Sequence, residues 1–542
     1  MPPEDGLNPD SLLDELIAAV EEELAEVRAS EAARRIPVFG GRCLAQTGAE
    51  GLYGFGLPYP VGLPDDVPLR IDLVAGGEPL AYTGQLVSAT SFEVTVACGA
   101  RLPDRFSNAS LTLDPSFILE QLISRLSELQ PEDCDLPLAL FGFRDPCNDG
   151  EAQELDDAEA NEFQLEALRA VLERDVVYVW GPPGTGKTTA LALIAEALVR
   201  RGLRVLAVAP TNVAVDNAAL KIAGRLGGEP PVVRYGTPQL AVLRQDAAPV
   251  LVVPAKRLPD GADEAARQRV LRQARLVVAT LSRVALAPEL ASPGFDAVVL
   301  DEASAAQLPA AFLAASLARC KLVALGDPKQ LPPVAQSKGP LSRRWLQRDV
   351  FAQAGLEDDD PRAVLLREQY RMPPAISCLA NELVYGGRLI DAPALKRSAG
   401  RARLVDTSGE AVRCERQGGS RLNRIHAELA VQLAEELAGS MQGSVAVITP
   451  YRAQARLIWR MLRDVGLERR IDVGTVHRFQ GLERQAIVFD TVEAAPERPA
   501  PFISGGYGSE AMRLINVALT RAQAELIVLA DVAHLRRGLQ RG

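Results

Sequence analysis

A glycine-rich string is the first part of the sequence whose residue types and spacing suit phosphate binding. It reads Gly181-Pro-Pro-Gly-Thr-Gly-Lys187-Thr188 and fits the pattern GxxxxGK[ST]. An apolar run, 176–180, precedes it and a helical pattern, 189–199, follows it, which is the context that a P-loop requires. Glycines let backbone N–H groups curl around phosphate oxygens, and the helix N-terminus adds a positive dipole. We expect nucleotide contacts from Gly181, Pro182, Pro183, Gly184, Thr185, Gly186, Lys187, Thr188 and Thr189.

Two carboxylates supply the other groups that phosphoryl transfer needs. Asp301 and Glu302 directly follow the apolar run 297–300. Asp301 and the Thr188 hydroxyl suit Mg²⁺, and Lys187 suits the β- and γ-phosphates of ATP. Glu302 suits the orientation and deprotonation of an attacking water. An acidic pair at a strand end is often only a solvated turn, but its position after the P-loop in the same predicted parallel sheet favours the catalytic interpretation.

Four further strings occur in a fixed order after the P-loop. They are LGDPKQLPP (325–333), LREQYRM (366–372), GTVHRFQGLE (474–483) and NVALTRA (516–522). Together with the P-loop and the DEAS string at 301–304, they resemble the Upf-like branch of superfamily 1 helicases over about residues 160–535. The combination is far more specific than any single string, because the order and the spacing match as well.

The resemblance implies a role for six further residues. Gln164 would read adenine, and its alternative is an exposed Gln at a helix start; Gln330 would sense the γ-phosphate, and its alternative is a capping residue. Arg371 and Arg521 would be arginine fingers that neutralise charge as the cleft closes, rather than surface ion pairs. Tyr370 would stack near adenine and Glu483 would bind the ribose, with core packing and a solvated carboxylate as their alternatives.

The same resemblance implies a nucleic-acid face at the ends of several strands. Small hydroxyl and amide side chains suit that role because they donate to phosphate and sugar without reading sequence, and an aromatic ring can stack on a base. Ordinary strand-end capping is the alternative for each. The residues are Pro210, Thr211, Asn212, Thr280, Thr449, Pro450, Tyr451, Thr475 and Val476.

Some positions depart from the pattern of the family. His477 and His426 stand where acidic residues are usual, Leu482 where Arg is usual, and Pro373-Pro374 where His-Pro is usual. None of them belongs to the expected hydrolytic set. We therefore expect ATP hydrolysis to be retained, whereas the grip on the strand is less secure.

Net charge alone argues against a nucleic-acid partner, since the chain carries −11. The acidity is concentrated, however, in residues 1–35, with a net charge of −7, and in residues 132–162, with a net charge of −10. The remainder is therefore mildly basic at +6. We expect both acidic segments to be solvated; a competing interpretation is that 132–162 competes electrostatically for the nucleic-acid groove.

The elements that must position these residues change character along the chain. We predict a stalk helix in 1–35, a small β-barrel in 36–115 and a helix with an acidic linker in 116–160. Apolar β-branched runs that alternate with helical segments then indicate parallel sheets. The fold class is α/β, with two tandem RecA-like P-loop domains over 161–350 and 351–542.

Taken together, the sequence predicts an ATP- and Mg²⁺-dependent helicase or translocase on single-stranded DNA or RNA. The branch implies 5′→3′ polarity. The alternative is an ATPase switch that clamps or remodels complexes without unwinding duplexes; a binding module with decayed catalysis is disfavoured, because the hydrolytic residues are intact. No run is apolar enough to span a membrane, and seven scattered cysteines indicate a reducing cytoplasm. Arginine outnumbers lysine, as in GC-rich bacteria, and we expect a monomer.

Overall fold

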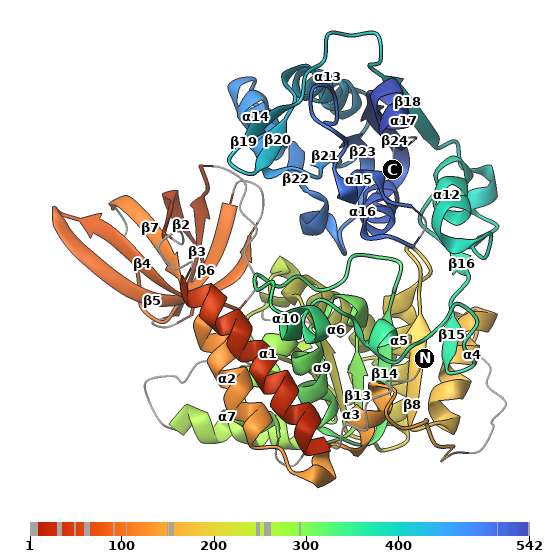
Figure 1. Ribbon diagram of the computed structural model, residues 1–542. Coiled ribbons are helices and arrows are strands. Elements are labelled where there is room, and N and C mark those ends of the chain that lie inside the picture. The colour runs from red at the N-terminus through yellow and green to blue at the C-terminus, as the bar shows by residue number, and fades with distance from the viewer. Residues whose placement is uncertain are drawn as a thin grey trace.

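The computed structural model contains a small antiparallel sheet domain beside two stacked α/β domains (Figure 1). A long helical stalk lies along the first α/β domain (Figure 1). Among the described residues, none of the helices has the length and apolar character needed to cross a membrane. The structure describes residues 9–29, 35–47, 50–58, 66–89, 93–103, 106–148, 150, 157–244, 250–253, 262–291, 294–506 and 508–539.

The antiparallel sheet closes on itself into a small barrel, here called the barrel domain. Its strand order is β1-β7-β4-β5-β6-β3-β2. The two outermost strands, β1 and β2, follow one another in the chain, and between them Val38 N donates to Ala109 O at 3.0 Å. One continuous segment therefore joins both edges, which removes exposed strand edges. The strands are β1 (Arg35–Pro37), β2 (Phe39–Thr47), β3 (Glu50–Gly56), β4 (Pro68–Ala75), β5 (Glu78–Ala89), β6 (Glu93–Cys98) and β7 (Ser107–Leu113).

The stalk consists of α1 (Pro9–Ala29) and α2 (Ser116–Ser127), which pack on each other and on the first α/β domain (Figure 1). Its acidic residues are not all solvated, contrary to the expectation for residues 1–35. Glu23 is buried, and its carboxylate accepts hydrogen bonds from the backbone N–H groups of Gln336 and Ser337 at 2.8 Å. Glu15 accepts a 2.8 Å bond from Trp345 Nε1. Part of the N-terminal negative charge therefore holds the stalk in place.

The first α/β domain, α4 to β15, is built on an eight-stranded parallel sheet of order β11-β10-β12-β9-β13-β14-β8-β15. The helices α4, α5 and α6 cover one face, and the stalk with α3 and α8 to α11 covers the other. The strands are β8 (Val176–Trp180), β9 (Val205–Ala209), β10 (Val232–Tyr235), β11 (Val250–Val253), β12 (Leu276–Thr280), β13 (Phe295–Leu300), β14 (Ala318–Gly326) and β15 (Ala363–Leu365). The helices are α4 (Glu162–Glu173), α5 (Lys187–Arg200), α6 (Asn212–Leu226), α7 (Ala262–Gln273), α8 (Leu281–Leu286), α9 (Leu308–Ala315), α10 (Pro340–Trp345) and α11 (Val350–Gln353).

The acidic linker predicted within 116–160 is in part a packed element. Residues 135–140 form α3, and its neighbour Phe141 is fully buried in the core under the sheet. The Tyr178 hydroxyl of β8 donates to Leu140 O at 2.7 Å. Residues 149 and 151–156 of this segment lie outside the described residues. Apolar side chains at 136–141, hidden within the acidic composition, account for the difference.

The end predicted for the first α/β domain, residue 350, also differs from the structure. Strand β15 pairs in parallel with β8 along Ala363–Leu365, so that the first sheet continues beyond this position. This short strand pairs with β8 at Trp180 and packs against helix α4. It is therefore an edge of the first sheet rather than the start of the second.

The second α/β domain, α12 to α17, has a five-stranded parallel sheet of order β18-β24-β23-β21-β22. One face packs on α12 and α16, and the other on α13 and α14. Its sheet strands are β18 (Arg401–Asp406), β21 (Val445–Thr449), β22 (Ile471–Thr475), β23 (Arg484–Asp490) and β24 (Ala522–Ala530). The short strands are β16 (Glu368–Gln369), β17 (Ile390–Asp391), β19 (Glu415–Gln417) and β20 (Ser420–Leu422). The helices are α12 (Pro374–Ala380), α13 (Arg424–Ser440), α14 (Arg452–Asp464), α15 (Pro501–Ser504), α16 (Glu510–Leu519) and α17 (Val532–Leu539), with a π-helix at Asn381–Tyr385. Two parallel α/β sheets in tandem confirm the predicted fold class.

Candidate nucleotide and nucleic-acid sites

The glycine-rich string forms a phosphate-sized loop between β8 and α5. Gly184 and Gly186 both have φ of +78°, a left-handed conformation that favours glycine. The Lys187 ammonium folds back over the loop and donates to Gly181 O at 2.9 Å. Thr185 Oγ1 donates to Pro182 O at 2.7 Å and closes the turn. The loop therefore directs its backbone and the lysine toward the position of a bound phosphate.

A second segment approaches this loop so closely that it requires glycine there. Tyr370 N donates to Gly184 O at 2.8 Å, and a Cβ on Gly184 would lie 2.6 Å from Arg371 Cβ. The QYRM string is therefore bonded directly to the P-loop, although the two are far apart in the sequence. Pro183, Thr188 and Thr189 complete the loop and the first turn of α5.

The predicted adenine-reading side chain lies beside the same loop. Gln164 is buried, and its Nε2 lies where a Cβ on Gly186 would come within 2.7 Å. Asn161 and Gln164 cap helix α4 reciprocally, and Asn161 Nδ2 donates to the Tyr370 hydroxyl at 2.8 Å. The Tyr370 side chain is 48% exposed, so its ring is open to a ligand. Gln164 therefore lies at a helix start, as its alternative has it, but it is buried beside the P-loop rather than exposed.

The acidic pair lies at the end of β13, facing the P-loop. Asp301 is buried, and burial, followed by the neighbouring Glu302 carboxylate, raises the pKa of Asp301 to about 7 against the opposing Lys187 ammonium. Glu302 has φ of +49°, a strained conformation for a residue with a side chain. Two neighbouring carboxylates, one of them buried, favour a bound cation. The hard oxygen donors of Asp301 and Thr188 therefore fit Mg²⁺.

Groups from the second α/β domain meet this site across the cleft. Arg521 is buried, and burial and then Arg371 lower the pKa of Arg521 to about 10. Its Nη2 donates to Gln330 Oε1 at 3.4 Å. Arg371 forms an ion pair with Glu483 and donates to Thr520 O at 3.2 Å. The structure thus brings both predicted arginine fingers and Gln330 together, and it pairs Glu483, the predicted ribose ligand, with a finger.

A buried polar network behind these residues was not predicted. Asp327 accepts hydrogen bonds from Trp180 Nε1 at 3.0 Å, from Gln330 Nε2 at 2.8 Å and from the Tyr385 hydroxyl at 2.7 Å. Asn516 Nδ2 donates to that hydroxyl at 2.7 Å from the second α/β domain. Asp327 and Asn516 lie inside the recognised strings, so their polar side chains could have been noticed in the sequence. Tyr385 lies outside these strings, and no sequence signal points to it.

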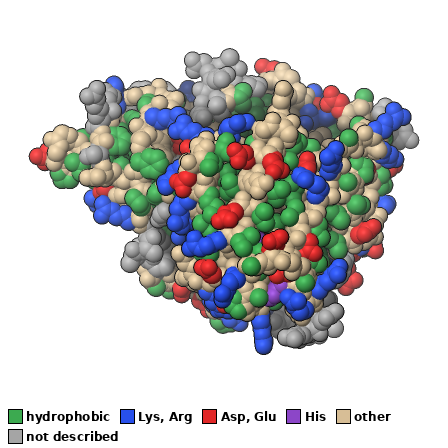
Figure 2. Space-filling view, turned by 90° about the horizontal axis from the view of Figure 1, so that it is seen from above, with side chains coloured by type: hydrophobic (Ala, Val, Ile, Leu, Met, Phe, Trp, Pro, Cys, Tyr) green, Lys and Arg blue, Asp and Glu red, His purple; other side chains and the backbone are tan. Residues whose placement is uncertain are grey.

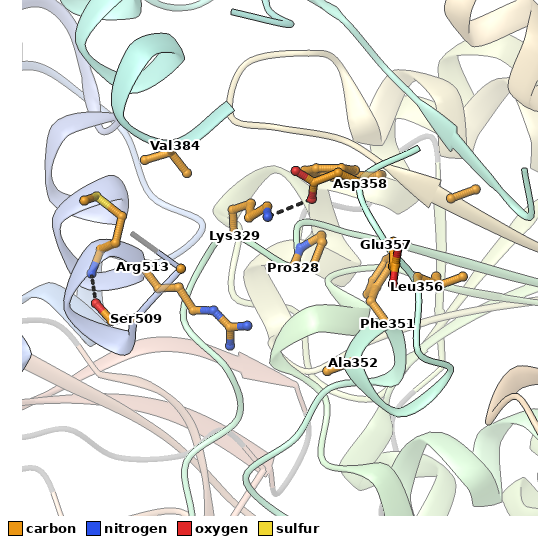
Figure 3. A pocket seen from close by; sticks show the side chains of 14 residues that line it. Pro328, Lys329, Phe351, Ala352, Leu356, Glu357, Asp358, Val384, Ser509 and Arg513 are labelled. Atoms are coloured by element: carbon orange, nitrogen blue, oxygen red, sulfur yellow. Dashed lines mark hydrogen bonds and ion pairs between the residues drawn. The ribbon is translucent and has the colours of Figure 1, made fainter. Parts of the chain in front are cut away.

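A cavity of about 140 Å³ lies at the boundary between the two α/β domains (Figure 3). Lys329 on one side forms a 2.7 Å ion pair with Asp358, and Arg513 of α16 extends toward the cavity from the other (Figure 3). Trp180, which precedes the P-loop, also lines it. Movement of one domain against the other would therefore reshape this cavity.

Four of the predicted nucleic-acid residues are accessible. Thr211 is exposed, and Pro210, Pro450 and Thr475 are half-buried. They follow β9 and β21 and end β22, and thus mark the same edge of both parallel sheets. Each sheet therefore presents accessible positions at the carboxyl ends of its strands.

Asn212 and Thr280 instead form hydrogen bonds to the barrel domain, which contradicts their predicted contact with nucleic acid. Thr280 Oγ1 donates to Asp66 Oδ2 at 2.5 Å, and Asn212 Nδ2 donates to Val87 O at 3.1 Å. Both side chains are buried, with 0% and 1% exposed. Arg283 also approaches Asp66, at 3.4 Å. The polar side chains at these strand ends therefore hold the barrel domain against the first α/β domain.

The prediction that Tyr451 stacks on a base is also wrong for this structure. Tyr451 is 6% exposed, its hydroxyl donates to the buried Glu493, and the Arg421 guanidinium lies 5.7 Å from its ring centroid. Thr449 and Val476 are fully buried as well. These three residues therefore belong to the packed interior and offer no surface to a strand.

Comparisons with known proteins agree with this arrangement. Residues 159–253 and 255–338 match one family model described as an AAA domain, and residues 346–533 match a second with the same description. The two matches together run through both α/β domains, from the segment before the P-loop to β24.

Three characterised relatives are helicases or DNA-binding proteins by name. The mouse 5'-3' DNA helicase ZGRF1 is 30% identical over 412 residues, which is 67% of this chain and 21% of that protein. DNA polymerase alpha-associated DNA helicase A of Schizosaccharomyces pombe is 27% identical, over 69% of this chain and 64% of its own length. Rat DNA-binding protein SMUBP-2 is 29% identical, over 68% and 42%. The chain thus spans less than two thirds of each of these relatives.

Among solved structures, an arterivirus nonstructural protein 10 helicase aligns at a TM-score of 0.41 and 14% identity, over 92% of this chain and 81% of that one. The family assignment depends instead on the matched models, the relatives and the ordered strings of the two α/β domains. On these grounds the chain belongs to the Upf-like superfamily 1 helicases.

Proposed function

We propose that the protein hydrolyses ATP in the cleft between its two α/β domains and uses the resulting domain movement to advance along a single strand of nucleic acid. This proposal rests on one contact between the two domains: Arg521 Nη2 donates a hydrogen bond to Gln330 Oε1 at 3.4 Å. A hydrolytic site divided in this way responds to closure of the cleft.

In the proposed reaction the attacking water forms a bond to the γ-phosphorus as the bond to the ADP oxygen breaks. Glu302 takes the proton of that water. Lys187, Arg371 and Arg521 stabilise the charge on the transferring phosphoryl group. Mg²⁺, held by Asp301 and Thr188, would supply further charge neutralisation at the β- and γ-oxygens. Release of the products would let the domains separate again.

The nucleic-acid strand is proposed to cross the sheet edge marked by Thr211, Pro210, Pro450 and Thr475. Polar groups that bind phosphate and sugar give a sequence-independent grip, as a motor requires. A 5′→3′ polarity is proposed because the family branch implies it, and a monomer is proposed as the active unit. Two of the relatives above are named as DNA helicases, which supports DNA as the first strand to test.

Two assays test this function. ATPase activity is titrated with matched single-stranded DNA and RNA at stated salt concentration, since backbone contacts depend on salt. Displacement of a strand from 5′-tailed and 3′-tailed duplexes then measures unwinding and polarity. Stimulation with displacement from the 5′-tailed duplex supports the motor. Stimulation without displacement favours the ATPase switch, and no stimulation by either strand rejects both.

A further inference from the structure

Helix α14 of the second α/β domain carries a row of exposed arginines. The spacing of four, four and three residues places them on one side of the helix. The other side packs into the core through Ile458 and Leu462. We call this row the α14 arginine face: Arg452, Arg456, Arg460 and Arg463.

Placing these charges together costs stability within the helix. Arginines four residues apart repel by about 0.2–0.5 kcal/mol for each pair, and α14 has no acidic residue before Asp464. Arg460 Nε donates to its own helix at Arg456 O, at 3.3 Å, and the Arg463 guanidinium lies 5.0 Å from the Trp459 ring centroid. In a chain of net charge −11, this local cluster of exposed positive charges favours binding of an anionic partner.

The position of the face identifies that partner. Helix α14 begins at Arg452, two residues after Pro450, at the end of the proposed groove that lies on the second α/β domain. In Figure 1 the helix lies on the side of its domain nearer the barrel domain, and Figure 2 shows Lys and Arg side chains gathered along that side. From Arg452 to Arg463 the helix extends about 16 Å, which spans roughly five phosphates of a B-form strand.

We propose that the α14 arginine face binds the phosphodiester backbone of the strand beyond the groove and so lengthens the footprint of the protein on nucleic acid. This inference rests on the proposed function, because it needs a strand in the groove. Arginine suits the role, since its guanidinium binds phosphate through paired hydrogen bonds.

The test compares two triple variants of the full chain. R456Q/R460Q/R463Q removes three charges from the face, and glutamine retains helix propensity. R269Q/R272Q/R275Q removes the same charge from exposed positions in and just after α7, at the far end of the first α/β domain (Figure 1). Fluorescence anisotropy measures binding of oligodeoxythymidine and oligouridine of 6 to 30 nucleotides between 50 and 200 mM salt.

The α14 variant should bind 30-nucleotide strands at least tenfold more weakly than the unmodified chain at about 100 mM salt. The slope of log affinity against log salt should fall by about 2, since each single-strand phosphate contact contributes about 0.7. The affinity loss should shrink as the strand is shortened to the length of the groove. The α7 variant should match the unmodified chain throughout.

Two further variants keep the test decisive. The single change Arg460→Gln should lower the slope by about 0.7, and R456K/R460K/R463K, which retains charge, should restore most of the affinity. An unchanged slope in the triple variant, or equal losses in the α14 and α7 variants, would overturn the inference and leave the proposed function standing. Failure of the unmodified chain to bind any strand would instead overturn the proposed function.

Discussion

Gln330 and Arg521 meet at 3.4 Å across the boundary between the two α/β domains, with the Arg521 guanidinium fully buried. Gln330 also donates to Asp327, which Tyr385 links to Asn516 of the second domain. The residue expected to sense the γ-phosphate and the residue expected to neutralise it are therefore in direct contact. Any ligand between them must move both.

Removal of the proposed general base should abolish hydrolysis without loss of ATP binding. In Glu302→Gln the amide retains the shape of the side chain but takes up no proton, and nucleic-acid-stimulated turnover should fall at least a hundredfold. Binding of a fluorescent ATP analogue should remain within threefold. Lys187→Ala should lose turnover too, because no ammonium then reaches the phosphates. Undiminished turnover in either variant would refute the site assignment.

The buried finger should act on turnover rather than on ATP affinity. Arg521→Lys retains a positive charge but loses the planar fork, and kcat should fall by about a thousandfold or more with a small change in KM. Arg536→Lys, on the exposed face of α17, is the matched control and should leave both constants unaltered. A purely structural Arg521 would show equal kcat in both variants once unfolding is excluded by thermal melting.

The Tyr385 hydroxyl should stabilise the contact between the two α/β domains. Tyr385→Phe leaves buried Asp327 and Asn516 each one hydrogen bond short, which should cost about 1–3 kcal/mol in the free energy of unfolding. Denaturant unfolding measures that loss. If the hydroxyl also couples the domains, kcat for strand-stimulated ATPase should fall while the KM for ATP stays constant; the same kcat in both proteins would limit Tyr385 to stability.

Thr280 should behave as a barrel contact and not as a nucleic-acid contact. Thr280→Val removes the donor to Asp66 and should lower the free energy of unfolding by about 1–3 kcal/mol. Strand affinity should stay within twofold, whereas Thr211→Ala, at an exposed position, should weaken it. A large loss of strand affinity in Thr280→Val with an undisturbed melting temperature would restore the sequence-based assignment.

Glu493 should make stability depend on pH in the mildly acidic range. Burial raises the pKa of Glu493, against hydrogen bonds from Tyr451 and the charge of Arg421. The native state therefore holds this proton more tightly than the unfolded chain. The stabilisation of the native state by protonated Glu493 is complete below the unfolded pKa, about 4.5. It is lost as pH rises through the native pKa.

Thermal melts of the unmodified chain and of Glu493→Gln between pH 4 and 7 isolate this effect. The melting temperature of the unmodified chain should fall relative to that of the variant as pH rises, because glutamine does not ionise. Parallel curves would show that Glu493 does not titrate in this range.

The candidate hydrolytic residues could be selected from the chain, and the structure brings them together around one loop. These residues lie in short strings whose backbone conformation follows from local sequence, such as the glycines at 184 and 186 and the acidic pair after β13. The strand-binding residues could not be selected in this way, since a threonine at a strand end is equally suited to cap a helix, bind a phosphate or anchor a neighbouring domain. Thr280 both caps α8 and anchors the barrel domain, and Asn212 anchors the barrel domain as well.

By itself the sequence determined the two-domain α/β architecture and the P-loop string, and it selected the candidate catalytic groups, because hydrophobic period and motif spacing are local properties. Only the tertiary structure decided which of these groups meet. The contact of Arg521 with Gln330, the seating of the barrel through Asp66 and the buried Tyr385 each join segments far apart in the chain. Such contacts depend on how whole sheets and helices pack, and no local pattern specifies that.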